Sequence, residues 1–186
     1  FLEELGLDDI NRLSKELDQA YTTGLYQKAI NLSEQVLVIT QKALGSEHPE
    51  TATSLNRLAM LYEVKGLYSK AEPLYVRALA IREKVLGPEH PHTAMSLNNL
   101  AIFYQDQGLY SQAEPLLIRA LAILEKALSP EHPYMLTNLS NLALFYMKQG
   151  FYSKAVPLEK RSLNKRLIFI QKEAPYMTIA ERQSFL

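Results

Sequence analysis

The chain has 186 residues, and 47% of them are hydrophobic, which is enough to bury a continuous core. Its 20 Lys and Arg residues balance 20 Asp and Glu residues, so no overall field attracts nucleic acid or an anionic membrane. The chain lacks cysteine and any stretch of the ~20 uncharged apolar residues that a membrane span requires, which excludes disulfides and membrane insertion, and we expect a cytoplasmic protein.

Two motifs recur at a fixed step of 42 residues. One is a glycine followed by an apolar residue and a tyrosine, at Gly24, Gly66, Gly108 and Gly150. The other is Glu-His-Pro, at 47–49, 89–91 and 131–133, with Glu-Ala-Pro at 173–175. A repeat of this length is typical of a stacked array, in which each unit buries its apolar face against its neighbours. Because such arrays present long concave surfaces, the repeat indicates a binding function.

Apolar spacing predicts two helices in each repeat, separated in turn by a glycine and a proline signal. In the clearest repeat, Gly66 suits a left-handed helix end and Pro91 suits the first turn of the following helix. We expect Ser69, Ser111 and Ser153 to be N-caps, so that the proline four residues later lies near the first turn. In chain order, the predicted helices cover residues 7–22, 27–43, 51–65, 69–86, 93–107, 111–128, 134–149, 153–170 and 176–185.

The pattern of large and small residues resembles the tetratricopeptide repeat, in its longer kinesin light chain form. The residues that carry the resemblance are Leu55, Leu58, Ala59, Tyr62, Ala71, Tyr75 and Ala78, followed by Leu97, Leu100, Ala101, Tyr104, Ala113, Leu117 and Ala120. The resemblance implies an all-α fold, a right-handed α-solenoid superhelix of helix-turn-helix units. We expect one array over residues 1–186, with repeats at about 7–48, 49–90, 91–132 and 133–174 and a terminal capping helix at 176–186.

The first helix of each repeat is expected to line the inside of the superhelix and to carry two rows of side chains. One row is polar and rich in carboxamides, which can donate to and accept from an extended peptide backbone. The other is apolar, and its methionines adapt to varied partners. The alternative is that the asparagines bond neighbouring helices and the apolar residues are core. The candidate groove residues are Lys15, Asn56, Arg57, Met60, Met95, Asn98, Asn99, Ile102, Asn141 and Leu144.

The groove is expected to be basic toward its N-terminal end, because Lys15 and Arg57 continue the row of Asn99 and Asn141. The resemblance to kinesin light chains implies that paired asparagines and basic residues grip a cargo peptide. Chaperone-binding tetratricopeptide domains need asparagine where this chain has Met60 and Ile102, so we do not expect binding of chaperone tails.

The three histidines of the Glu-His-Pro runs stand in separate loops, a whole helix pair apart, and therefore cannot meet at one metal ion. We expect His48, His90 and His132 to serve capping and loop packing instead. No phosphate-binding glycine loop, nucleophile elbow or paired-carboxylate motif stands out. The sequence therefore predicts no enzyme, no metal and no cofactor.

The leading hypothesis is an adaptor or scaffold that holds a protein or peptide partner in its concave groove. An alternative is a regulatory or sensor arm of a larger protein, such as a caspase-like (CHAT) peptidase, because residues 178–186 resemble the linker that opens such domains. The first residue, Phe1, is not Met, so we expect a fragment with a possible fused downstream domain. A third possibility is a structural scaffold that forms homo-oligomers through exposed terminal helices.

Overall fold

The computed structural model describes residues 2–130 and 132–173, and over these residues the chain is helical with no β-strand. The helices are α1 (Leu2–Thr22), α2 (Tyr26–Leu44), α3 (Pro49–Val64), α4 (Tyr68–Leu86), α5 (Pro91–Asp106), α6 (Tyr110–Ala127), α7 (Pro133–Lys148) and α8 (Tyr152–Glu173). They confirm the all-α fold and the first eight predicted helices, although α1 begins earlier than expected. The predicted helix 176–185 and the capping segment 176–186 lie outside the described residues.

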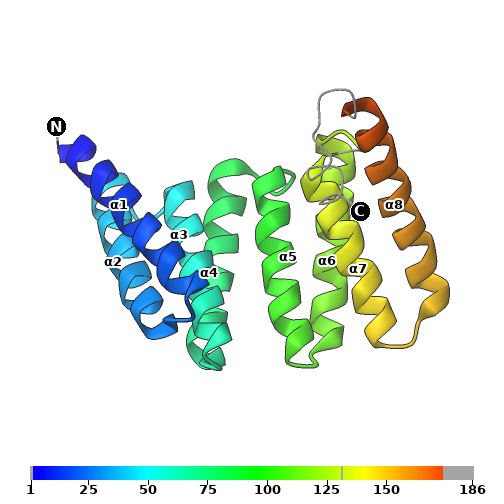
Figure 1. The fold of residues 1–186 in the computed structure, drawn as a ribbon, viewed down its shortest axis with the longest axis horizontal. Helices are drawn as coiled ribbons and strands as arrows, with labels where there is room; N and C mark the ends of the chain where they lie inside the picture. The colour runs from blue at the N-terminus through cyan, green and yellow to red at the C-terminus, as the bar shows by residue number, and fades with distance from the viewer. Residues whose placement is uncertain (1, 131, 174–186) are drawn as a thin grey trace.

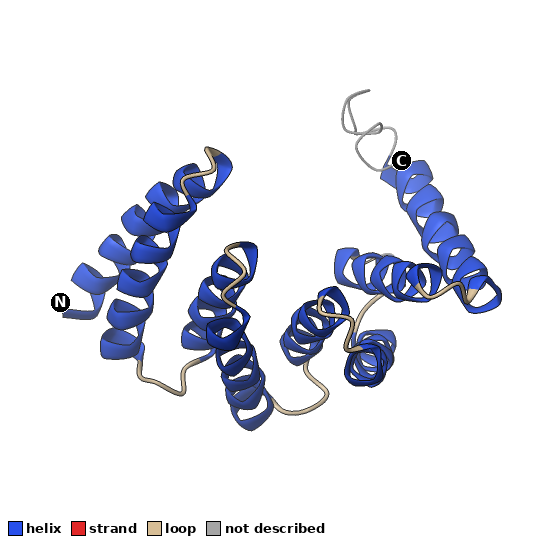
Figure 2. Ribbon diagram, turned by 90° about the horizontal axis from the view of Figure 1, so that it is seen from below, coloured by secondary structure: helices blue, strands red, loops and turns tan. Residues whose placement is uncertain are grey.

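The helices pack as consecutive antiparallel pairs. Within a pair, α1 lies on α2, α3 on α4, α5 on α6 and α7 on α8, and the second helix of each pair contacts the first helix of the next. Figure 1 shows this order side by side, and Figure 2 shows the pairs following one another along an arc. The first helices also contact each other, α3 with α5 and α5 with α7. The chain is therefore an α-solenoid, as predicted.

Each pair turns at a glycine with a left-handed backbone. At Gly66, where φ is +72°, the N–H donates to the Glu63 carbonyl at 2.8 Å, and the Leu67 N–H donates to the Tyr62 carbonyl at 2.8 Å. These bonds satisfy the last carbonyls of α3. The next helix follows immediately at Tyr68, which leaves no room for an extended capping serine.

The predicted serine N-caps are therefore wrong. Leu67 and Leu109 occupy the N-cap positions of α4 and α6 and make no side-chain capping bond. The serines expected as caps, Ser69, Ser111 and Ser153, lie inside α4, α6 and α8. The prolines four residues after the serines lie farther inside the same helices.

Successive pairs are joined by loops that end in a histidine N-cap. His48, His90 and His132 have extended backbones, and the Nδ1 atom of each accepts a hydrogen bond from the backbone N–H two residues later, at 3.1 to 3.2 Å. A proline follows each histidine in the first helical turn, where its missing N–H has no intrahelical acceptor. The expected capping role of the histidines is confirmed. Within 2–130 and 132–173, no three His, Asp or Glu side chains are grouped so that they could hold a metal ion.

Small residues let the inner helices approach closely. Ala59, Ala101 and Ala143 are fully buried at equivalent positions of α3, α5 and α7. Phe103 and Phe145 fill the space between repeats, and the rings of Tyr68 and Tyr110 meet them edge-on. None of the described helices combines the length and the apolar composition needed to cross a bilayer. The core consists of three clusters of buried residues, which partly buried side chains such as Leu74, Leu79 and Tyr104 connect.

Candidate functional site

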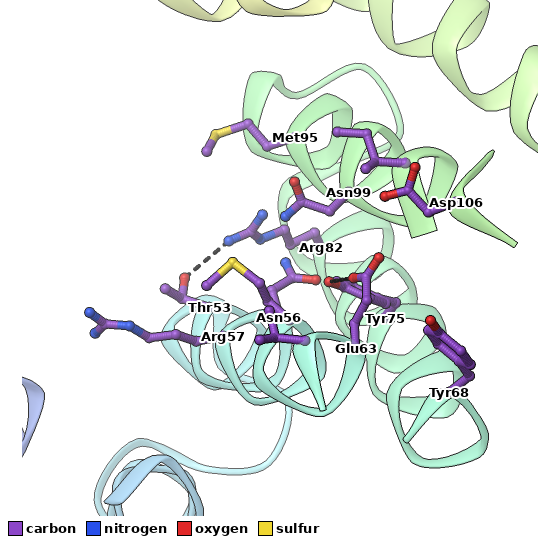
Figure 3. Close-up of a pocket in the computed structure, with 13 residues that line it drawn as sticks. Thr53, Asn56, Arg57, Glu63, Tyr68, Tyr75, Arg82, Met95, Asn99 and Asp106 are labelled. Atoms are coloured by element: carbon purple, nitrogen blue, oxygen red, sulfur yellow. Dashed lines mark hydrogen bonds between the residues drawn. The ribbon is translucent and has the colours of Figure 1, made fainter. Parts of the chain in front are cut away.

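A groove of about 680 Å³ opens between the first helices of the second and third pairs, and we call it the α3–α5 groove. Figure 3 shows its walls, with α3 on one side, α5 on the other and side chains of α4 between them. Its lining residues are Thr53, Asn56, Arg57, Met60, Glu63 and Val64 from α3, Tyr68, Tyr75 and Arg82 from α4, and Met95, Asn99, Ile102 and Asp106 from α5. Six of the ten predicted site residues are among them.

The other four predicted residues lie elsewhere. Asn98 lines a smaller cavity of about 210 Å³, together with Met95, Asn99 and residues of α6 and α7. Asn141 and Leu144 lie on α7, and Lys15 is exposed on α1. The α3–α5 groove therefore does not include the whole predicted set.

The apolar row consists of Met60, Ile102 and Leu144. Met60 is 40% exposed and Leu144 is 44% exposed, and Ile102 is partly buried. Side chains that were simply core would be covered at these positions, as their neighbours Leu61 and Phe103 are. The alternative that this row is core is therefore wrong for Met60 and Leu144.

The asparagines bond mainly between repeats. Asn56 is 8% exposed, and its Nδ2 donates to Ser96 Oγ of α5 at 3.2 Å. Asn98 is 9% exposed, and its Oδ1 accepts from Nδ2 of Asn138 at 3.2 Å and of Asn141 at 3.0 Å, both on α7. The alternative interpretation of the asparagines thus describes Asn56, Asn98 and Asn141. Of these asparagines, Asn99 lines the groove half-buried and makes no such bond within the described part of the chain, so the expected open ladder of carboxamides does not form.

Arg82 is a groove residue that the sequence analysis missed. It is 5% exposed, and its guanidinium donates to the His92 carbonyl at 3.0 Å, to Ser96 Oγ at 3.1 Å and to Thr53 Oγ1 at 3.0 Å. All three acceptors are neutral. Burial lowers the pKa of Arg82, and the field of Glu50 opposes that change. A signal was available, because Arg82 follows Ala78 by one helical turn on the buried face of α4.

Carboxylates line the opposite end of the groove. Glu63 Oε2 accepts a hydrogen bond from the Tyr75 hydroxyl at 2.8 Å. Burial raises the pKa of Glu63, the bond from Tyr75 opposes the rise, and the nearby charge of Asp106 adds to it. Asp106 pairs with Lys148 of α7 at 3.2 Å. The groove thus has carboxylates at the C-terminal ends of α3 and α5.

The two predicted basic residues differ in their ion pairing and in their position. Arg57 lines the groove but forms an ion pair with Asp18 of α1, so its charge is already partly countered. Lys15 is exposed on α1. The buried Arg82 is therefore a positive charge of the groove that the expected basic end did not include.

Several solved structures share this architecture. A putative kinesin light chain from Podosopora anserina with nearly identical TPR-like repeats is 29% identical, with a TM-score of 0.73, over 100% of this chain and 83% of that chain. BtubC from P. vanneervenii is 24% identical, with a TM-score of 0.74, over 86% of this chain and 64% of that chain. The apo form of RapI is 20% identical, with a TM-score of 0.72, over 95% of this chain and 65% of that chain. The last two show the fold alone, and this chain spans less than two thirds of their length.

No curated protein sequence matches the chain. The family model of the tetratricopeptide repeat matches residues 19–84, 52–105 and 93–166, which together cover most of the chain. These segments overlap from the first helix pair to the last, as the repeat marked by the glycines predicts. The chain belongs to the tetratricopeptide repeat family.

Proposed function

We propose that the chain is a non-catalytic adaptor that holds a peptide segment of a partner protein in the α3–α5 groove. The observation that carries the proposal is one open groove of about 680 Å³, in which the exposed Met60 and the partly buried Met95 and Ile102 lie beside buried polar groups. Membership of the tetratricopeptide repeat family and the likeness to other repeat proteins support a role in protein–protein interaction.

The groove offers two kinds of contact to a peptide. Met60, Met95 and Ile102 provide apolar surface, and flexible methionine side chains fit partners of different shape. Asn99 provides a carboxamide that both donates and accepts, which suits a peptide backbone. Lys15, Asn98, Asn141 and Leu144 remain candidate contacts for a longer partner that continues along the inner helices.

The experiment selects binding peptides from a displayed random library and measures their affinity for two variants. Met60→Glu places a charge in the groove, whereas Val76→Glu places one at an equally exposed site, since Val76 is 46% exposed on α4 and outside the groove. We expect Met60→Glu to weaken binding about tenfold or more and Val76→Glu to leave it unchanged. Selected peptides that bind both variants like the parent chain contradict the proposal.

The second hypothesis, a regulatory arm of a caspase-like peptidase, depends on residues 178–186. These residues lie outside those that the structure describes. The groove favours the adaptor, and a regulatory arm of a larger protein could hold a partner peptide in the same groove.

A further inference from the structure

The α3–α5 groove has charges of opposite sign at its two ends. From this arrangement we infer that its partner is a peptide with an acidic side chain that binds beside Arg82 and a basic side chain that pairs with Glu63 and Asp106. The inference rests on the proposed function and adds the chemistry of the partner. Figure 3 shows the two ends, with Arg82 between Asn56 and Asn99, and Asp106 away from them.

The cationic end is a buried guanidinium without a direct ion pair among the described residues. The three hydrogen bonds of Arg82 go to neutral oxygens, and the charge of Glu50 acts on it only through its field. A buried charge without a partner of opposite sign destabilises a folded protein. A carboxylate of the partner would offset this cost, which gives the site a preference for an acidic side chain.

Two buried atoms at this end lack hydrogen-bond partners in the described part of the chain. They are Arg82 Nε, a donor, and Asn56 Oδ1, an acceptor. Both residues line the groove and are more than nine-tenths buried. Both atoms are covered in this structure, so the two side chains must turn toward the groove before a carboxylate can accept from Nε and a backbone N–H can donate to Oδ1. An acidic residue within a peptide carries both groups, whereas a free anion carries only the first.

The acidic end has two carboxylates. Glu63 is held by the Tyr75 hydroxyl, and Asp106 faces it from α5. The ion pair of Asp106 with Lys148 is exposed, with side-chain exposures of 47% and 43%, so it contributes little and can be exchanged for a pair with the partner. This end therefore favours a lysine or arginine.

The spacing of the two ends sets the spacing of the charges in the peptide. The Arg82 guanidinium bonds Thr53 of α3 and Ser96 of α5. Glu63 and Asp106 each lie ten residues farther along those helices. At a rise of about 1.5 Å per residue, this separation spans roughly 15 Å. An extended peptide covers that length in about four to five residues. Apolar side chains between the charges would lie on Met60 and Ile102.

The test uses pools of short peptides with blocked ends, in which Asp and Lys are fixed about four to five positions apart and the other positions are randomised neutral residues. Both orders of Asp and Lys are made. Control pools carry Asp at both positions, Lys at both, or Gln at both. Fluorescence anisotropy measures the affinity of the intact chain for each pool. We expect one of the two Asp/Lys orders to bind about tenfold tighter than every control pool.

Variants of the chain test which groove residues recognise the two charges of the peptide. Asp106→Lys should weaken the preferred Asp/Lys pool about tenfold and strengthen the Asp/Asp pool. Its matched control is Glu89→Lys, which also removes an exposed carboxylate that pairs with a lysine, Lys126, but lies outside the groove. Arg82→Gln should abolish the preference for Asp. If that variant does not fold, the peptide pools and Asp106→Lys still decide the question.

The outcomes separate this inference from the proposed function. If the Gln/Gln pool binds as tightly as the Asp/Lys pools and Met60→Glu abolishes that binding, the groove binds peptides but the charge rule is wrong. Equal loss in the Asp106→Lys and Glu89→Lys variants also overturns the charge rule. If neither the pools nor a random library binds, the proposed function itself fails.

Discussion

Single side chains stabilise this protein by hydrogen bonds to backbone N–H groups at the starts of helices. His48 is an example, because its Nδ1 accepts from the Glu50 N–H at the start of α3. Loss of such an acceptor leaves a helix N–H without its partner. The same position recurs in α5 and α7, so the array depends on one capping device used three times among the described helices.

We predict that His48→Ala lowers the free energy of unfolding by roughly 0.5–2 kcal/mol, the usual effect of losing an N-cap. His48→Asn restores a side-chain acceptor and should remain close to the parent chain. Urea unfolding followed by circular dichroism measures both. Equal stability of the alanine and asparagine variants would show that the capping bond contributes nothing.

Glu63 is a residue whose titration should be visible in stability. Its pKa is raised in the folded chain, chiefly by burial. The folded state therefore holds the proton more tightly than the unfolded state, and this contribution is complete below the unfolded pKa and is lost as the pH rises through the folded pKa. We predict that the stability of the parent chain relative to Glu63→Gln falls as the pH rises above about 4.3.

Unfolding curves collected across the acidic range give this difference at each pH. Tyr75→Phe is the useful companion, because it removes the bond that opposes the rise in the pKa of Glu63. The fall in stability should then begin at the same pH and continue to a higher pH. A constant difference between the parent chain and Glu63→Gln would mean that the two states bind the proton equally.

At the scale of helices and turns, the glycine at each hairpin fixes where one helix stops. Gly66 has a φ of +72°, and a Cβ added there would meet no atom within 4 Å. The penalty for a larger residue is therefore one of backbone conformation, not of crowding. We predict that Gly66→Ala lowers the free energy of unfolding by about 1 kcal/mol, measured by urea unfolding. An unchanged midpoint would contradict this account of the turn.

The contact between α5 and α7 depends on Asn98. Its Oδ1 accepts from two carboxamides, so Asn98→Ala leaves both Asn138 and Asn141 without that acceptor. We predict a loss of about 1–3 kcal/mol in the free energy of unfolding. Asn99→Ala serves as the control, because Asn99 lies in the groove wall and should affect peptide affinity more than stability. Equal stability of the two variants would remove the structural role of Asn98.

At the scale of the whole molecule, each pair of helices contacts mainly its sequence neighbours. Tyrosine hydroxyls link successive pairs at recurring positions: Tyr62 to Glu34, Tyr104 to Glu72 and Tyr146 to Glu114, at 2.6 to 2.9 Å. Stability in such an array is a sum over units and their interfaces. A local defect should therefore stay local.

We predict that Leu139→Ala, a substitution at a fully buried site of α7, costs about 2–5 kcal/mol in the pairs that it touches. Hydrogen exchange should then accelerate in α7 and α8, while α1 and α2 keep the protection of the parent chain. Leu55→Ala in α3 is the matched control. It should accelerate hydrogen exchange in the first helix pairs and leave α7 and α8 as protected as in the parent chain. Uniform acceleration along the chain would indicate a single cooperative unit instead.

The periodic part of this fold was open to prediction, because helix ends here follow local rules. Gly66 ends one helix and Pro91 begins another through their own backbone preferences, so the positions of the helices could be predicted from them. Ser69 was misjudged, since the bonds that close the glycine turn start the next helix directly. Asn98 could not be assigned from the sequence, because a small rotation of α5 decides whether its carboxamide meets a neighbour or a ligand. The helical spacing from Ala78 could have placed Arg82 on the buried face of α4, but its bonding partners on α3 and α5 required the structure.

The position of Arg82 is not shared by all units. At the same place in the first and third helix pairs the chain has Thr40 and Leu124, although Arg166 stands there in the last pair. The number of grooves with a buried arginine therefore does not follow from the number of repeats. A further copy of residues 91–132 carries the leucine at this position. Its insertion would lengthen the solenoid without creating a second groove that has a buried arginine.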